Sequence, residues 1–203
     1  MGFVQIGAFD GKTNDPLHDL VRRHGWRGVL VEPQPEPFAR LRETYADVDE
    51  LVLLNAAVAE RRGSMTLWRV GNPKPDDPWW IAQAASFSRE HLVGHIPDRP
   101  DLHERIIGQD VEALTLADVF ERSPVPVDVL QIDAEGYDAK IVSMLDHIDV
   151  SPTVVRFEHR NLSSADHSAT LDRLAARHYR FVIGEDDTLA VQYQAGRGST
   201  ATS

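Results

Sequence analysis

Two apolar segments of the chain end in polar side chains that can do chemistry. Residues 127–132 are followed by the motif Asp133-Ala134-Glu135-Gly136-Tyr137-Asp138, and residues 153–157 are followed by Glu158 and His159. A histidine can accept a proton from a hydroxyl group near neutral pH, and carboxylates are the ligands that Mg²⁺ prefers. Because open α/β sheets bind ligands outside the carboxyl ends of their strands, we expect both ends to share one cleft.

Three interpretations of this cleft remain open. His159 acts as the general base towards a hydroxyl acceptor, with Asp133 and Glu158 beside it. Alternatively Asp133, Glu158 and His159 hold a divalent metal, Mg²⁺, that acidifies the hydroxyl. In the structural interpretation, Asp133 or Glu135 only satisfies free amides at the start of the next helix.

A glycine turn near the start of the chain has the features of a cofactor site. The apolar residues 3–6 lead into Gly7-Ala8-Phe9-Asp10-Gly11, and Asp15-Pro16 is expected to begin a helix. A second apolar strand, residues 28–31, ends at Glu32, about 20 residues after the turn, which is the spacing of the acid that binds ribose hydroxyls.

The charge of this turn favours S-adenosylmethionine over NAD. Only Gly7 and Gly11 are present, so the G-x-G-x-x-G pattern of dinucleotide enzymes fails. Asp10 would repel a pyrophosphate and would suit the ammonium group of a methionine moiety. Asn55, at the end of the third expected strand, either lies beside the adenine or caps the strand. The residues expected to bind the cofactor are Gly7, Ala8, Phe9, Asp10, Gly11, Asp15, Glu32, Pro33, Asn55, Ala57 and Asp133.

The elements that position these residues alternate between strands and helices. This order predicts an α/β fold with a mainly parallel, Rossmann-like sheet of about seven strands and helices on both faces. Residues 180–183 and 188–193 are expected to close the sheet as an antiparallel hairpin. We expect one domain over residues 1–194, interrupted by an insertion at 71–110, and a disordered tail at 195–203.

Composition narrows the classes of partner. The 203 residues include 21 basic and 32 acidic side chains, a net charge of −11, so binding to nucleic acid is not expected. The chain contains no cysteine and no apolar run of about 18 residues, which excludes thiolate metal sites and argues against a membrane span. Its first residues do not form a signal peptide, so we expect a cytoplasmic protein. The sequence does not indicate an oligomeric state.

Six motifs, in order along the chain, resemble the FkbM-type methyltransferases. They are residues 6–16, 31–35 (Val-Glu-Pro-Gln-Pro), 55–58 (Asn-Ala-Ala-Val), 85–87 (Ala-Ser-Phe), 131–138 and 157–159 (Phe-Glu-His). The resemblance implies a class I methyltransferase fold and O-methylation of sugar or natural-product hydroxyls. It also implies that Gly7–Gly11 and Glu32 hold S-adenosylmethionine. The turn departs from the family at Phe9, where other members often carry asparagine.

The insertion at 71–110 is expected to shape the acceptor site. It opens with proline-rich loop chemistry, and the pair Trp79-Trp80 then follows. We expect Trp79, Trp80 and Ser86 to contact a small-molecule or carbohydrate acceptor, although the indoles could instead cover the core. Two other functions compete with methyl transfer: a nicotinamide-dependent oxidoreductase, and a cofactor-binding module without turnover.

Overall fold

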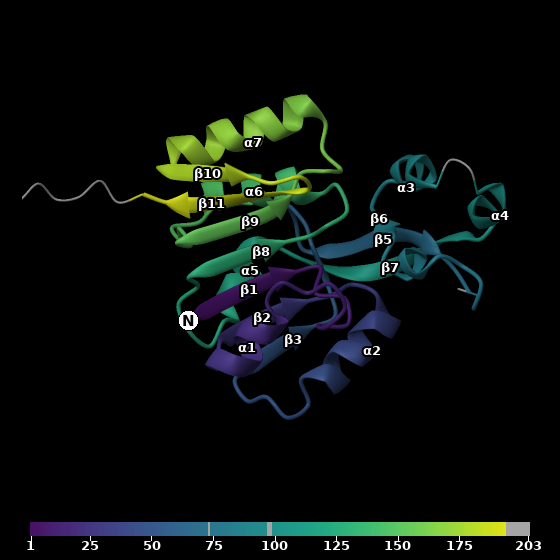
Figure 1. Cartoon of the computed structure of the whole chain (residues 1–203), viewed down its shortest axis with the longest axis horizontal. Helices are drawn as coiled ribbons and strands as arrows, with labels where there is room; N and C mark the ends of the chain where they lie inside the picture. Colours follow the sequence, from purple (N-terminus) through teal and green to yellow (C-terminus); the bar gives the residue numbers. More distant parts are fainter. Residues whose placement is uncertain (73, 97–98, 194–203) are drawn as a thin grey trace, which may run out of the picture.

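The computed structural model describes residues 1–72, 74–96 and 99–193, apart from the side chains of Trp79, Ala82 and His95. The predicted tail at 195–203 lies outside these residues. A seven-stranded sheet forms the centre of the molecule (Figure 1). Its strands, in spatial order, are β10 (Tyr179–Ile183), β11 (Asp187–Gln192), β9 (Val154–Glu158), β8 (Val129–Ile132), β1 (Gly2–Ile6), β2 (Arg27–Val31) and β3 (Leu51–Leu54).

The sheet is parallel except at its carboxyl-terminal edge. β1, β2, β3, β8 and β9 pair in parallel, whereas β11 runs antiparallel to both β9 and β10. The predicted α/β fold, with a mainly parallel sheet of about seven strands and a final antiparallel hairpin, is confirmed.

Helices cover both faces of this sheet, and the side chains of β1 alternate between them. Phe3 packs with helices α1 (His18–His24) and α2 (Pro35–Thr44) on one face. Val4 and Ile6 pack on the other face. The helices that cover that second face are α5 (Leu116–Glu121), α6 (Asp138–Met144, continued by a 3₁₀ turn at Leu145–His147) and α7 (Ser164–Ala176).

α1 begins later than the sequence predicts. The expected amino-terminal cap at Asp15 is wrong, because the helix begins at His18 after Leu17. The Asp15 Oδ1 atom accepts a hydrogen bond of 2.7 Å from the amide of Leu17 in the preceding loop. Asp15 is therefore part of the loop that follows the glycine turn.

A second, four-stranded sheet lies at the end of the large sheet where β1, β8 and β9 terminate (Figure 1). Its strands, in spatial order, are β4 (Ala57–Val58), β7 (Ile106–Leu114), β5 (Gly63–Val70) and β6 (Ala85–Ser86). Between β5 and β7 lie the 3₁₀ turn η1 (Trp79–Ala82) and helices α3 (Arg89–His95) and α4 (Pro100–His103). The insertion thus ends in a long strand that the sequence did not reveal. In the described part of the chain, no helix is both long and apolar enough to span a membrane.

Candidate active site

A cavity of about 700 Å³ opens at the carboxyl ends of β1, β2, β8 and β9. This volume is typical of small-molecule sites. The insertion closes one side of the cavity. Eleven of the residues predicted from the sequence line it: Gly7, Ala8, Phe9, Asp15, Glu32, Pro33, Ala57, Trp80, Ser86, Asp133 and Glu158.

Gly7 brings two strand ends into contact. Its φ of +76° favours glycine, and a Cβ atom at this position would lie 1.8 Å from the carbonyl oxygen of Asp133. The amides of Gly7 and Ala8 both donate to the carbonyl of Val31, at 3.0 Å. The end of β1 is therefore held between the ends of β2 and β8. Phe9, at the cavity, also has a positive φ of 47°.

Glu32 is the acid at the end of β2, and it is only 3% exposed. Its carboxylate accepts hydrogen bonds from the amides of Phe9, at 2.9 Å, and Gln34, at 2.8 Å. Burial raises the pKa of Glu32 to about 7, although the two amide donors oppose the shift. A carboxylate accepts about four hydrogen bonds, so two acceptor positions remain for a ligand.

Asp10 does not reach the cavity. Its carboxylate accepts from the amides of Lys12 and Thr13 and from the Thr13 hydroxyl, at 3.0, 2.7 and 2.7 Å, and so stabilises its own turn. Gly11 also lies outside the cavity lining. The expectation that Asp10 binds an ammonium group is not supported by this position.

Asp15 and Gln5 provide the acceptors that Asp10 does not. Gln5 Nε2 donates to Asp15 Oδ1 at 3.0 Å. Gln5 Oε1 and Asp15 Oδ2 are buried at the cavity and have no hydrogen-bond partner among residues 1–72, 74–96 and 99–193. Two unpaired acceptors side by side suit an ammonium group.

Sequence reasoning missed Gln5, although a signal was present. Gln5 is the one polar side chain in the apolar run of β1, and it is 3% exposed. It lies in register with Gln131 of β8, which pairs in turn with Arg156 of β9. These three side chains form a polar row across the sheet floor of the cavity. A polar residue inside a buried strand is the type of observation that points to a ligand.

Asn55 has a structural role. Its Nδ2 atom donates to the backbone carbonyls of Glu32, at 2.8 Å, and Pro33, at 3.1 Å. Asn55 is not part of the cavity lining, whereas Pro33 and Ala57 are. Of the two alternatives left open, the geometry favours the one in which Asn55 ties the strand ends together.

Three carboxylates line the cavity where β8 and β9 end: Asp133, Glu135 and Glu158. Asn161 Nδ2 donates to both Glu158 Oε2, at 2.6 Å, and Glu135 Oε2, at 3.2 Å. The neighbouring guanidinium groups belong to Arg156 and Arg160, and these pair instead with Asp187 and Asp186. The three carboxylates thus face the cavity without an ion-pair partner in the described part of the chain.

His159 points away from this end of the cavity. Its Nδ1 atom lies 3.0 Å from the Thr188 hydroxyl, and its ring stacks on His167 with centroids 4.3 Å apart. His159 does not belong to the cavity lining. Its position argues against the predicted role as general base.

The predicted metal site finds no support. Among the described residues, no group of three or more metal-binding side chains is placed to hold an ion. Asp133 and Glu158 share the cavity, but His159 lies outside it.

The insertion forms one wall of the cavity. Trp80 and Ser86 line it as expected, while the side chain of Trp79 lies outside the described structure. Phe87 also lines the cavity and contacts the ring of Tyr137 edge-on, with centroids 5.1 Å apart. The insertion thereby rests on the loop that carries Asp133 and Glu135.

Comparison with known proteins identifies the family. The family model described as "Methyltransferase FkbM domain" matches residues 5–181. The chain belongs to the FkbM methyltransferase family. The resemblance to the FkbM-type methyltransferases that the six sequence motifs indicate is thereby confirmed.

Solved structures agree with the FkbM fold. Methyltransferase FkbM from Methylobacillus flagellatus KT superposes with a TM-score of 0.57 at 12% identity, over 94% of this chain and 43% of that one. The chain thus spans less than half the length of that protein. A fibrillarin/Nop5p complex (TM-score 0.45, 13% identity, 95% and 72% coverage) and the Methanococcus jannaschii fibrillarin pre-rRNA processing protein (0.47, 11%, 94% and 64%) are also similar. No curated protein matches in sequence.

The carboxyl groups of this FkbM methyltransferase have unusual pKa values. The surrounding protein raises the pKa of Asp133 to about 6, although its carboxylate is open to the cavity, and Asp187 adds to the shift. Burial raises the pKa of Glu135 and of Glu158 to about 8, with Asp133 adding to both. Asp138, fully buried behind them, has a pKa raised to about 7, again mainly by burial. Carboxyl groups that titrate near neutral pH suit proton transfer.

These shifts predict how the stability of the FkbM domain depends on pH. A carboxyl group whose pKa is higher in the folded protein stabilises it below the unfolded pKa, and this stabilisation is lost as pH rises through the folded value. Since the folded values of Glu135, Asp138 and Glu158 lie at about 7 to 8, the free energy of unfolding should fall by at least about 1 kcal/mol from pH 6 to pH 8.5. Urea denaturation at both pH values measures this change.

Glu158→Gln provides the internal control for this measurement. It removes one of the titrating groups, so the fall between pH 6 and pH 8.5 should be smaller than in the unmodified protein. A free energy of unfolding that instead rises steadily over this range would show that the carboxyl groups ionise without penalty.

Proposed function

We propose that this methyltransferase acts on a hydroxyl group of a small molecule or sugar. One observation carries the proposal: a single cavity is lined both by Gly7 and Glu32, which follow β1 and β2, and by the carboxylates of Asp133 and Glu158, at the ends of β8 and β9. The first pair has the features of a cofactor site. The second pair offers proton acceptors to a hydroxyl group.

The residues present fit S-adenosylmethionine. Glu32 has two free acceptor positions for the ribose hydroxyls, and Gln5 Oε1 and Asp15 Oδ2 are unpaired acceptors for the ammonium group. When bound, this cofactor supplies a methyl group that is electrophilic because it is attached to a sulfonium. Gly7 and Ala8 keep the turn small enough for a ligand to approach the backbone.

Glu158 is the proposed general base. Its carboxylate lines the cavity and is oriented by Asn161. A hydroxyl group is a weak nucleophile, and transfer of its proton to the Glu158 carboxylate would leave the oxygen able to attack. Asp133 lies at the same end and orients the acceptor by accepting hydrogen bonds from its hydroxyl groups.

The wall that the insertion forms suits a sugar ring or another flat polar acceptor. Trp80 and Phe87 provide aromatic surface, while Gln83 and Ser86 provide hydrogen-bonding groups. Small-molecule sites combine such apolar surface with a few placed polar groups. This composition supports a compact, hydroxyl-bearing acceptor.

Isothermal titration with S-adenosylmethionine, and with NADH as a control, tests the cofactor half. Binding of the first ligand alone is expected. A panel of hydroxyl-bearing sugars and natural products, assayed by transfer of a labelled methyl group, then tests the chemistry. Cofactor binding without transfer to any hydroxyl, but with transfer to an amine or thiol, would contradict O-methylation; binding without any turnover would favour a non-catalytic module.

Asp15→Asn and Asp10→Asn form a matched pair for the ammonium site. Asp15→Asn should weaken S-adenosylmethionine binding by about 10- to 100-fold, because a charged acceptor is lost. Asp10→Asn should change the affinity by less than about 3-fold, since Asp10 bonds only to its own turn. Calorimetry measures both, and a larger effect at Asp10 would restore the ammonium role predicted from the sequence.

A further inference from the structure

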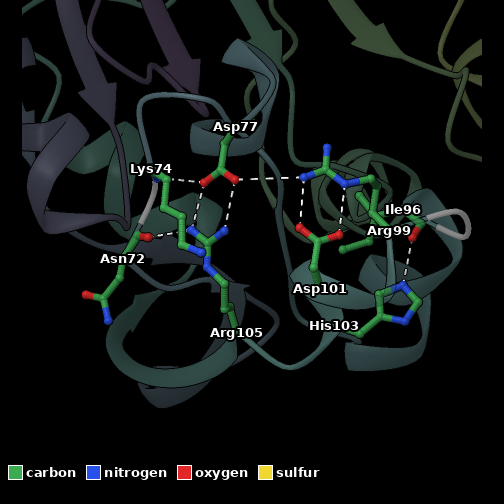
Figure 2. Close-up of polar contacts among 8 residues, drawn as sticks. All are labelled: Asn72, Lys74, Asp77, Ile96, Arg99, Asp101, His103 and Arg105. Atoms are coloured by element: carbon green, nitrogen blue, oxygen red, sulfur yellow. Dashed lines mark hydrogen bonds and ion pairs between the residues drawn. The ribbon is translucent and has the colours of Figure 1, made fainter.

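Asp77 and Arg105 form a polar clamp at the neck of the insertion, the place where its two ends meet between β5 and β7. The Asp77 carboxylate accepts from Arg105 Nη1 and Nη2, at 2.9 and 2.7 Å, and from the amide of Lys74, at 2.6 Å (Figure 2). Arg105 Nη2 also donates to the carbonyl of Asn72. The Asp77 side chain is 4% exposed because these partners cover it, although it lies near the molecular surface. Arg105 holds the pKa of Asp77 well below its usual range.

The clamp joins the two ends of the insertion. Asp77 lies shortly after β5, and Arg105 directly precedes β7. The amide of Gly71 donates to the carbonyl of Arg105 at 2.9 Å, so backbone and side chain both close the neck. A bidentate Arg–carboxylate pair fixes direction as well as distance. The segment that follows Asp77 therefore leaves the neck in one direction.

That segment, residues 78–87, is the wall segment of the cavity. It contributes Trp80, Gln83, Ala84, Ala85, Ser86 and Phe87 to the lining. Ile81 of this segment packs in a small apolar cluster with Val70, Ile96 and Leu102. The end of the segment is held separately, because β6 pairs with β5 and Phe87 contacts Tyr137. The polar clamp therefore acts on the beginning of the wall segment, before β6, where four buried side chains form only a small core.

A second ion pair in the insertion differs from the clamp. Arg99 bonds Asp101 at 2.9 Å through two nitrogens, and this pair is exposed, at 36% and 57% (Figure 2). Arg99 lies 3.9 Å from Asp77 and contributes one weaker contact. Exposed pairs contribute little to stability, so the Arg99–Asp101 pair serves as a matched control.

We propose that Asp77 is a positioning residue for the acceptor site, which fixes the wall segment through Arg105 without contacting cofactor or acceptor. The proposal rests on the proposed function, because it takes the wall segment as the acceptor side of the cavity. It adds a determinant of acceptor recognition outside the cavity itself. Asp77 is not part of the cavity lining.

Asp77→Asn should loosen the wall segment and leave the cofactor half unchanged. Backbone amide exchange over residues 79–87 should accelerate by about tenfold or more, whereas S-adenosylhomocysteine should bind within about twofold of its original affinity. In protein labelled with 5-fluorotryptophan, the ¹⁹F resonance of Trp80, assigned with Trp80→Phe, should shift or broaden. The resonance of Trp26, which packs beside Phe3 just before β2 and does not line the cavity, should not move.

Two variants make the outcome decisive. Asp77→Glu keeps the carboxylate and should restore most of the slow exchange, while Asp101→Asn should behave like the unmodified protein. Fast exchange in Asp101→Asn, unchanged exchange in Asp77→Asn, or movement of both tryptophan resonances would overturn the positioning role. Failure of S-adenosylhomocysteine to bind the unmodified protein would instead contradict the proposed function, so the two failures are distinguishable.

Discussion

Replacing Glu32 by glutamine is expected to weaken S-adenosylmethionine binding by about 100-fold. The Glu32 carboxylate already accepts from the amides of Phe9 and Gln34, and the residue lines the cavity with two acceptor positions left. The glutamine amide would present an N–H₂ group either to a backbone N–H or to the ligand. Hydrogen bonds to charged groups contribute about 1.5–3 kcal/mol each, and 100-fold corresponds to about 2.7 kcal/mol.

Calorimetry at pH 8, where Glu32 is ionised in most molecules, gives the cleanest comparison. The matched control is Glu36→Gln on helix α2. The Glu36 side chain is exposed and pairs with Arg69. The affinity of the unmodified protein should also fall as pH drops through about 7, because protonation removes the charge that the ribose hydroxyls bind. Equal affinities for Glu32→Gln and the unmodified protein would place the ribose elsewhere.

Glu158→Gln is expected to lower the rate of methyl transfer by about 10² to 10⁴, the usual contribution of a general base. The change should affect kcat with little effect on cofactor affinity, because Glu158 is at the end of β9, whereas the proposed cofactor residues Gly7 and Glu32 follow β1 and β2. It should be measured with the best acceptor from the hydroxyl panel, across pH 6 to 9. The rise of kcat with pH, expected as Glu158 ionises near pH 8, should disappear in the variant.

His159→Ala distinguishes the carboxylate base from the histidine base. Since the His159 ring stacks on His167 and bonds Thr188, its loss should reduce kcat by less than about tenfold, through local loosening alone. If His159→Ala abolishes transfer and Glu158→Gln does not, the assignment is reversed. Asp133→Asn, at the same end of the cavity as Glu158, should raise the acceptor KM more than it lowers kcat.

The errors made from sequence share a physical cause, which is side-chain direction. Glu158 and His159 are consecutive, and successive side chains along a strand point to opposite faces. Only one of the two can enter the cavity, and residue type alone suggested the histidine. Asp10 shows a related limit: the charge of the turn suggested an ammonium ligand, but the Asp10 carboxylate accepts hydrogen bonds from Lys12 and Thr13 of its own turn.

The parts that could be predicted depend on patterns of several residues. Apolar runs that end at Gly7, Glu32 and Asp133 fix where strands stop, and parallel strands bring those ends together. β7 was missed because Ile106–Leu114 mixes polar and apolar residues without strict alternation, and it pairs with β5 in the second sheet. Gln5 was overlooked because one polar residue does not interrupt an apolar strand pattern.

The close contact between Gly7 and Asp133 links the turn after β1 to the loop after β8. Backbone meets backbone there, with no room for even one methyl group before the carbonyl of Asp133. The turn proposed to hold the methyl donor and the loop proposed to face the acceptor are therefore expected to move together. If the loop after β8 were replaced by that of another family member, the glycine turn should be replaced with it, because the backbones of the two segments are packed directly against each other.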